Sequence, residues 1–265
     1  MSIRPVALVT GASAGIGQAF AEALARDGYD VIAVARRRER LDALAARLAA
    51  EHDARVEVLV ADLATPAGVD AVAARAGSTP LDLVINNAGF GGYRRFVELD
   101  PKVADELMSV HVRAVVQLTR AALPGMLERG RGGIVNVASL LALSGSAPPG
   151  NFLPMRAVYA GAKAFLLTFT QVLASELAGT NVRVQVCLPG LIKTEFHEVQ
   201  GMDTSKFPPR MSPEDVVRGS LASLAKGEVV CVPALEDVAA LQRIDEAQRA
   251  VMAVATKPVL ASRHG

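Results

Sequence analysis

The sequence is poor in several features that mark particular classes of protein. Its formal net charge is only +1, which gives no electrostatic case for nucleic acid or an anionic membrane as the main partner. No apolar run is long enough to predict a membrane span, and no hydrophobic segment with a cleavage site follows Met1. We therefore expect a soluble, cytoplasmic protein.

Cysteines, linkers and low-complexity segments are also scarce or absent. The two cysteines, Cys187 and Cys231, lie in apolar stretches typical of strands. This placement predicts buried free thiols and argues against a disulfide or a metal pair. A content of 51% hydrophobic and 21% charged residues fits a globular protein and argues against disorder. Without a linker, the length predicts one domain over residues 1–265.

What the sequence does contain is a regular alternation of short apolar segments and helical patterns. Seven segments are predicted as strands: 6–10, 30–35, 56–61, 81–85, 133–138, 182–188 and 228–232. Alternation of this kind is typical of an α/β fold. We predict a doubly wound, mostly parallel seven-stranded sheet with helices on both faces.

The first predicted strand runs into a glycine loop and then a helix. The loop, from Gly11 to Gly17, has the spacing G-x-x-x-G-x-G, which differs from the usual G-x-G-x-x-G, and an alanine-rich helical pattern follows over 18–26. Glycines let the backbone approach a pyrophosphate closely, and the helix start offers unpaired N–H groups and its positive dipole end. Strand, loop and helix together predict a dinucleotide site.

Two arginines follow the second predicted strand, at the point where a dinucleotide fold reads the adenosine ribose. Ala35 is followed by Arg36 and Arg37. An acid here accepts from a free 2′-hydroxyl, whereas arginine donates to a 2′-phosphate. The sequence therefore predicts NADP(H) rather than NAD(H), the alternative being a solvated basic start to the helix over 38–51.

Other polar or small residues follow later strands. Asp62 could accept from the adenine amino group, with Leu63 beside the ring, or could cap a turn. The Asn86–Gly89 segment, Ser139 and Pro189 also follow predicted strands. Because the carboxyl ends of parallel strands meet at the edge where ligands bind, we expect these residues to share one site.

Tyr159 and Lys163 stand four residues apart in a helical pattern, so they lie on one face of a helix. A neighbouring ammonium stabilises a phenolate, so we expect the tyrosine pKa to fall from about 10 towards the working pH, where the phenol can exchange a proton. Alone, the pair also fits a solvated helix face.

Taken together, the motifs resemble those of the short-chain dehydrogenase/reductase family over roughly residues 5–232. They are T-G-A-S-A-G-I-G from Thr10, N-N-A-G from Asn86, Ser139, Y-x-x-x-K from Tyr159, and P-G-x-x-x-T from Pro189 to Thr194. The resemblance implies that Tyr159 is the acid/base, that Ser139 hydrogen-bonds the substrate oxygen, and that Lys163 holds the nicotinamide ribose.

The resemblance also implies an enzyme that interconverts a carbonyl and an alcohol by hydride transfer with NADP(H), with reduction the expected direction. Its small-molecule substrate is expected to be fairly hydrophobic, and the chain to form a homodimer or homotetramer. The alternatives are a catalytically silent NADP(H)-binding sensor or scaffold, and an isomerase or dehydratase on the same fold. The expected cofactor contacts are Gly11, Ser13, Gly15, Ile16, Gly17, Arg36, Arg37, Asp62, Leu63, Asn87, Ala88, Gly89, Tyr159, Lys163, Pro189, Gly190, Ile192 and Thr194.

The sequence departs from the family pattern in two places. His111 stands where the family usually has an asparagine that helps hold a water joining the lysine to solvent. We count His111 among the catalytic candidates, although its backbone carbonyl alone could hold that water. The interval between Ser139 and Tyr159 is longer than usual and contains a Pro- and Gly-rich loop over 144–155, which we expect to shape the substrate site.

The C-terminal third is expected to supply a substrate lid over 190–212. The predicted substrate contacts are Tyr93, Phe152, Phe196 and Met202, with ordinary packing as the alternative. Ser212 has the features of a helix N-cap. A last helix over 236–256, apolar at helical spacing, is expected to cover the body of the protein or a partner subunit.

Overall fold

The computed structural model describes residues 4–150, 153–256 and 258–264. The chain divides into two compact units, Met1–Pro233 and Ala234–Gly265. The second unit contains α8 (Ala239–Ala255) and a short 3-10 helix, Ser262–His264. The helix expected over 236–256 is thus present, while one domain over the whole chain stays a prediction.

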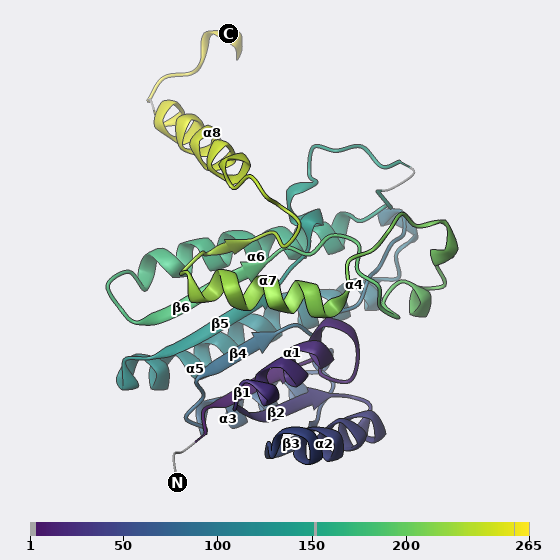
Figure 1. Cartoon of the computed structure of the whole chain (residues 1–265). Helices are drawn as coiled ribbons and strands as arrows, with labels where there is room; N and C mark the ends of the chain where they lie inside the picture. The colour runs from purple at the N-terminus through teal and green to yellow at the C-terminus, as the bar shows by residue number, and fades with distance from the viewer. Residues whose placement is uncertain (1–3, 151–152, 257, 265) are drawn as a thin grey trace. The chain divides into compact units, whose positions relative to one another are not determined.

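Within the described residues of the first unit, seven strands form one sheet in the order β3-β2-β1-β4-β5-β6-β7, and every neighbouring pair is parallel (Figure 1). The strands are Val6–Thr10 (β1), Asp30–Ala35 (β2), Val56–Val60 (β3), Leu83–Asn86 (β4), Gly132–Val137 (β5), Val182–Cys187 (β6) and Val230–Cys231 (β7). The predicted fold class is confirmed. The strand order reverses between β1 and β4, which opens a crevice at the carboxyl ends of these strands.

Helices cover both faces of this sheet (Figure 1). One face carries α1 (Gly15–Arg26), α2 (Arg38–His52) and α7 (Pro213–Ala225), and the other carries α3 (Pro66–Gly77), α5 (Ala114–Arg129) and α6 (Ala157–Glu176). Successive residues of β1 alternate between the two layers: Val9 packs with the α1 layer and Leu8 with the α5 layer. Because both faces are covered, the strands are almost continuously apolar.

Short elements connect these layers. They are α4 (Pro101–Met108), a π-helical turn at Ser109–Arg113, and 3-10 turns at Phe96–Glu98, Leu140–Leu143, Glu198–Gln200 and Thr204–Lys206. Side chains cap three of the helices: Thr65 caps α3, Asp100 caps α4 and Ser212 caps α7, as predicted for Ser212. The start of α1, after Ala14, has no side-chain cap, so its first N–H groups are free for another acceptor.

Strand β7, at one edge of the sheet, has two residues, whereas five were expected. Cys187 of β6 and Cys231 of β7 lie side by side in the parallel register, and both are buried and free, as predicted.

Helix α6 corrects one expectation from the sequence. By length and composition it could cross a membrane, and it is alone in this among the described residues, so the view that no apolar run is long enough was wrong. Its composition follows from its place in the fold, since α6 packs on β6 and on the turns at 109–113 and 140–143. Leu166 and Leu173 are buried there, together with Tyr159 and Lys163.

Candidate active site

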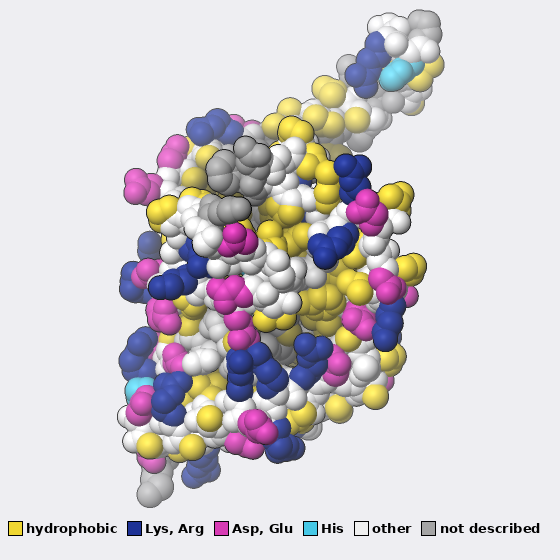
Figure 2. Space-filling model, turned by 90° about the vertical axis from the view of Figure 1, so that its right-hand side faces the viewer, with side chains coloured by type: hydrophobic (Ala, Val, Ile, Leu, Met, Phe, Trp, Pro, Cys, Tyr) yellow, Lys and Arg dark blue, Asp and Glu magenta, His cyan; other side chains and the backbone are white. Residues whose placement is uncertain are grey.

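A cavity of about 1170 Å³ lies at the carboxyl ends of β1, β2, β4, β5 and β6. On the face that holds its mouth, apolar side chains gather around a hollow, with charged side chains at its rim (Figure 2). Among the residues that the structure describes, every predicted site residue lines this cavity apart from Gly17. Gly17 acts through packing, and Phe152 lies outside the described residues. The structure therefore brings the scattered motifs into one site.

The glycine loop folds as a cradle at one wall of the cavity. Gly11 and Gly15 have positive φ values of 69° and 55°, a conformation that favours glycine. A Cβ atom at Gly17 would lie 2.3 Å from the carbonyl oxygen of Gly11, so only glycine allows α1 to start so close to β1. Together with the uncapped first turn of α1, this geometry fits the diphosphate of a dinucleotide.

Thr10, which begins the T-G-A-S-A-G-I-G motif but was not among the expected site residues, holds the end of β1 against the segment after β4. Its hydroxyl accepts hydrogen bonds from the backbone N–H of Asn87 (2.9 Å) and Ala88 (3.0 Å) and donates to the carbonyl of Ile85 (3.2 Å). The Asn87 amide in turn donates to the Thr10 carbonyl at 2.9 Å. These bonds fix the backbone that lines the crevice.

The two arginines after β2 are not equivalent. Arg37 donates from Nε and Nη2 to the hydroxyl of Ser13 in the glycine loop, at 3.1 and 2.9 Å. The Arg36 side chain is 72% exposed and lies 3.9 Å from Asp62. Asp62 also accepts from the backbone N–H of Ala64 at 3.0 Å, so it is a turn aspartate that borders the cavity. Arg37 is therefore held against the glycine loop, whereas Arg36 lies at the exposed rim of the cavity.

An acid from the far side of the site also reaches these arginines. Glu195 accepts from Nη1 of Arg37 at 2.5 Å and from Nη1 of Arg40 at 2.9 Å. Burial opposes ionisation of this carboxyl, but the hydrogen bonds from Arg40 and Arg37 lower the pKa of Glu195 overall. Sequence reasoning missed Glu195 because it lies 158 residues from Arg37 in the chain.

The three residues of the expected catalytic group lie close together in the wall of the cavity. Tyr159 and Lys163 project from the first turns of α6, and Ser139 follows β5. The Ser139 hydroxyl accepts from the backbone N–H of Leu141 at 3.2 Å and hydrogen-bonds Tyr159. Lys163 donates to the Val137 carbonyl at 2.9 Å, and its Nζ lies 5.6 Å from the centre of the Tyr159 ring.

Burial sets the protonation of this group. It raises the pKa of Tyr159 to about 12, against the lowering effect of hydrogen bonds with Ser139 and Tyr93. It lowers the pKa of Lys163 to about 7. The expectation that Lys163 brings the tyrosine pKa down is therefore wrong in this structure, because desolvation of the phenol outweighs every neighbour and the ammonium donates to a backbone carbonyl instead.

A buried amide network supports α6 from below. Asn86 of β4 donates to the amide oxygen of Asn136 of β5 at 2.9 Å, and Asn136 donates to the hydroxyl of Thr170 on α6 at 2.9 Å. Thr170 donates to the carbonyl of Leu166 at 2.7 Å. Satisfied networks of this kind fix one packing arrangement. The helix that carries Tyr159 is thus tied to the two central strands.

His111 lies in the π-helical turn between α4 and α5, a type of turn that is frequent at functional sites. Its Nε2 is 2.8 Å from the Phe90 carbonyl oxygen, and its ring meets the Tyr159 ring edge-on at 5.4 Å. Its Nδ1 is buried with no hydrogen-bond partner in the part of the chain that the structure describes. Burial, with the charge of Lys163, lowers the pKa of His111 well below its usual 6.5, so the imidazole is neutral.

The two ends of the expected lid segment lie side by side, because Ile192 and Met211 form an isolated parallel bridge. Phe196, from the first part of this segment, lies 6.3 Å from the Tyr159 ring. His197 contacts the rings of both Phe196 and Phe207 edge-on, at 5.3 and 5.1 Å. The end of the cavity beside Tyr159 is consequently lined by aromatic rings.

Arg156, three residues before Tyr159, organises the long loop that the sequence predicted. It is 8% exposed and donates to the hydroxyl and carbonyl of Ser144 and to the carbonyls of Ala147 and Pro154, at 2.8 to 3.1 Å. Sequence reasoning missed this residue, although a lone arginine beside the Y-x-x-x-K motif was a visible signal. It fixes the cavity wall at Ser144, Ala147 and Pro154.

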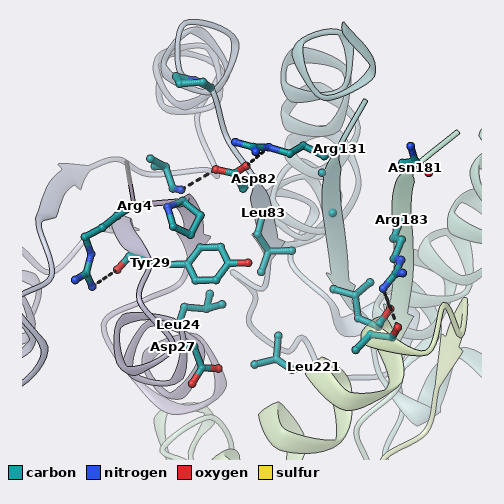
Figure 3. Close-up of a pocket in the computed structure, with 17 residues that line it drawn as sticks. Arg4, Leu24, Asp27, Tyr29, Asp82, Leu83, Arg131, Asn181, Arg183 and Leu221 are labelled. Atoms are coloured by element: carbon teal, nitrogen blue, oxygen red, sulfur yellow. Dashed lines mark hydrogen bonds and ion pairs between the residues drawn. The ribbon is translucent and has the colours of Figure 1, made fainter. Parts of the chain in front are cut away.

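A second cavity, of about 820 Å³, lies at the opposite, amino end of the strands (Figure 3). Its arginines are already engaged: Arg4 with the Tyr29 carbonyl, Arg131 with Asp82, and Arg183 with carbonyls at the end of α7. None of the predicted site residues lines it.

Comparisons with known proteins agree with this geometry. The model of the family described as short chain dehydrogenase matches residues 5–204. A very-long-chain 3-oxoacyl-CoA reductase of Anas platyrhynchos is 30% identical over 224 residues, which cover 82% of this chain and 68% of that protein. An uncharacterized oxidoreductase of Myxococcus xanthus (strain DK1622) is 40% identical over 201 residues, 74% of this chain and 75% of the relative.

Solved structures extend the similarity to nearly the whole chain. A short-chain dehydrogenase from Sphingobium yanoikuyae in complex with NADPH has a TM-score of 0.91 at 34% identity, covering 98% of this chain and 99% of that one. The bulky-bulky ketone specific alcohol dehydrogenase from Comamonas testosteroni has a TM-score of 0.87 at 30% identity, covering 98% of both chains. The sheet order, the glycine cradle and these matches lead to one conclusion: the chain is an oxidoreductase that belongs to the short-chain dehydrogenase/reductase family.

Proposed function

We propose that the protein is an NADP(H)-dependent reductase that converts a hydrophobic ketone or aldehyde to an alcohol, with Tyr159 as the acid/base. The observation that carries this proposal is one cavity that holds both the Ser139–Tyr159–Lys163 group and the Ser13–Arg37 pair beside the glycine cradle. The first is suited to proton transfer and the second to a 2′-phosphate.

The chain's own residues would act on the carbonyl oxygen, while the nicotinamide cofactor supplies the hydride when bound. Ser139 donates a hydrogen bond to the substrate oxygen and stabilises the charge that develops on it. Tyr159 then donates its proton to that oxygen. A pKa of about 12 keeps the phenol protonated at neutral pH, which suits a proton donor. Lys163, with a pKa of about 7, can replace the proton that Tyr159 loses.

Preference for NADP(H) is supported by the contacts of Arg37 and by the position of Ala35, where no acid stands to accept from a free 2′-hydroxyl. Three of the similar structures contain NADPH or NADP by their descriptions. Titration of the protein with NADPH and NADH tests this preference. Tighter binding of NADH would refute it.

The substrate class is inferred from the cavity wall and from two relatives. Leu143, Leu153, Phe196 and Met202 line the cavity together with other apolar side chains, and Phe196 lies beside Tyr159. A relative acts on very-long-chain 3-oxoacyl-CoA and a similar structure on bulky-bulky ketones, as their descriptions state. We infer a ketone with large apolar substituents. Cytoplasmic location and a homodimeric or homotetrameric state stay predictions.

The test is NADPH consumption by the purified protein against a panel of hydrophobic ketones, aldehydes and diketones, with the products identified. We expect turnover that Tyr159→Phe abolishes while NADPH still binds, because the ring packing is kept and only the proton donor is lost. Binding of NADPH with no turnover on any compound would favour a sensor, and products formed without net NADPH oxidation would favour an isomerase or dehydratase.

A further inference from the structure

Two of the three tyrosines in the chain meet in the active site. Tyr93 lies in the loop after β4, and Tyr159 lies on α6. Their ring centres are 5.3 Å apart with the planes at 65°, and each phenol shifts the pKa of the other. The Tyr159 hydroxyl therefore has Ser139 and a second phenol as its polar neighbours.

Tyr93 also contacts the lid. Its ring is stacked on the imidazole of His197, with 6.5 Å between the centres and 15° between the planes. Two residues earlier, the backbone at Gly91 packs so tightly on the lid that an added Cβ would lie 2.0 Å from Oε1 of Gln200. Gln200 is itself fixed by a hydrogen bond from its Nε2 to the Phe196 carbonyl at 2.6 Å. Residues 91–93 thus pack directly against the lid.

We propose that Tyr93 is a positioning residue that couples the lid to the acid/base: its hydroxyl holds the Tyr159 hydroxyl and donates to it when Tyr159 gives up its proton, while its ring is held by His197. This inference rests on the proposed role of Tyr159. The direction of the hydrogen bond follows from the two environments. Burial and the neighbouring Tyr159 raise the pKa of Tyr93 strongly, so Tyr93 keeps its proton and stays the donor.

The proposal has a specific consequence for pH dependence. A phenolate that accepts a hydrogen bond is stabilised, so loss of the donor raises the pKa of the phenol. Tyr93→Phe keeps the ring and its packing on His197 but removes the hydroxyl. In alcohol oxidation, where Tyr159 must be ionised, the rising limb of the rate against pH should therefore move up by about one pH unit, the worth of one hydrogen bond to a charged group.

The experiment compares the parent protein with Tyr93→Phe from pH 7 to pH 10, with NADP⁺ and the alcohol of the best substrate found. Because the Tyr159 pKa of about 12 lies above this range, both rates should rise throughout it, and the shift is read as the displacement between the two rising curves. We expect the shifted limb, a loss of up to about tenfold in kcat at neutral pH, and unchanged affinity for NADPH, which also shows that the variant is folded. The matched control is Tyr29→Phe, because Tyr29 lies in the cavity at the other end of the sheet. It should behave as the parent.

The proposed coupling between the lid and Tyr159 is tested by substitution of His197. His197→Phe keeps a ring to stack on Tyr93 and should leave the limb in place, whereas His197→Ala should move it in the same direction as Tyr93→Phe. In the double variant Tyr93→Phe/His197→Ala the two shifts should not add, since both act through one hydroxyl.

The outcomes separate this inference from the proposed function. If Tyr93→Phe changes only KM and keeps the parent pH profile, Tyr93 merely shapes the pocket and the inference is overturned. Loss of turnover in Tyr159→Phe would still support the role of Tyr159 as the acid/base. If His197→Ala leaves the limb in place, the coupling to the lid is overturned. If Tyr159→Phe itself stays active, the proposed function fails first.

Discussion

Replacement of Lys163 by methionine should change how the stability of the protein depends on pH. Lys163 is 3% exposed, and its ammonium donates to the Val137 carbonyl. Burial lowers its pKa to about 7, whereas an unfolded lysine titrates near 10.4. Methionine is similar in length and carries no charge, so it keeps most of the packing and removes the titration.

The sign follows from proton counting. Between pH 7 and about 10.4 the unfolded chain binds a proton at Lys163 that the folded chain has released, so the free energy of unfolding rises with pH across this window. Below the folded pKa the buried ammonium is charged and its desolvation penalty is fully present. From pH 7 to pH 9.5 the contribution of Lys163 should rise by roughly 3 kcal/mol, by linkage between the two pKa values.

The assay is urea unfolding of the parent and of Lys163→Met at pH 7, 8 and 9.5. The difference between the two free energies of unfolding should change by roughly 3 kcal/mol over this range, in favour of the parent at high pH. Other titrating groups, the buried cysteines among them, are common to both proteins and cancel. The control is Lys226→Met, at an exposed lysine after α7, which should give a constant difference. A constant difference for Lys163→Met as well would refute the reasoning.

Two further predictions concern residues around the site. Glu195→Gln removes the partly exposed carboxylate that pairs with Arg37 and Arg40, so NADPH should bind up to about fivefold tighter, which corresponds to the ~1 kcal/mol of an exposed ion pair. Calorimetric titration should show unchanged binding of NADH, and an equal change for both cofactors would contradict the prediction. His111→Asn should keep turnover within about threefold, and the parent's pH–rate profile should have no limb near 6.5, because burial keeps the imidazole neutral. A limb there that vanishes in the variant would show that His111 carries the proton.

Local pattern was enough to predict the sheet and most of the site. The strand ends were visible as apolar segments closed by a small or polar residue, and one rule of parallel sheets then placed Ser139, Asn87 and Pro189 on one edge. Tyr159 and Lys163 followed from helical spacing. These predictions succeeded because each depends on neighbours within a few residues of the chain.

What the sequence could not predict depends on long-range contacts. Glu195 meets Arg37 across 158 residues, and Thr10 meets Asn87 across 77. The direction of the Tyr159 pKa shift was wrong because spacing reports that an ammonium is near but not how deeply the phenol is buried. The place of Arg156 beside the Y-x-x-x-K motif was visible in the sequence, but its four hydrogen bonds to the loop, which define its role, were not.

The distribution of the tyrosines has a spectroscopic consequence. The chain contains no tryptophan and three tyrosines, so its ultraviolet emission comes from phenols alone. Two of the three, Tyr93 and Tyr159, touch each other in the active site, and Tyr29 is at the far end of the sheet. Changes in tyrosine fluorescence therefore report on the active site, and in a Tyr29→Phe protein the remaining tyrosine emission would come from Tyr93 and Tyr159 alone.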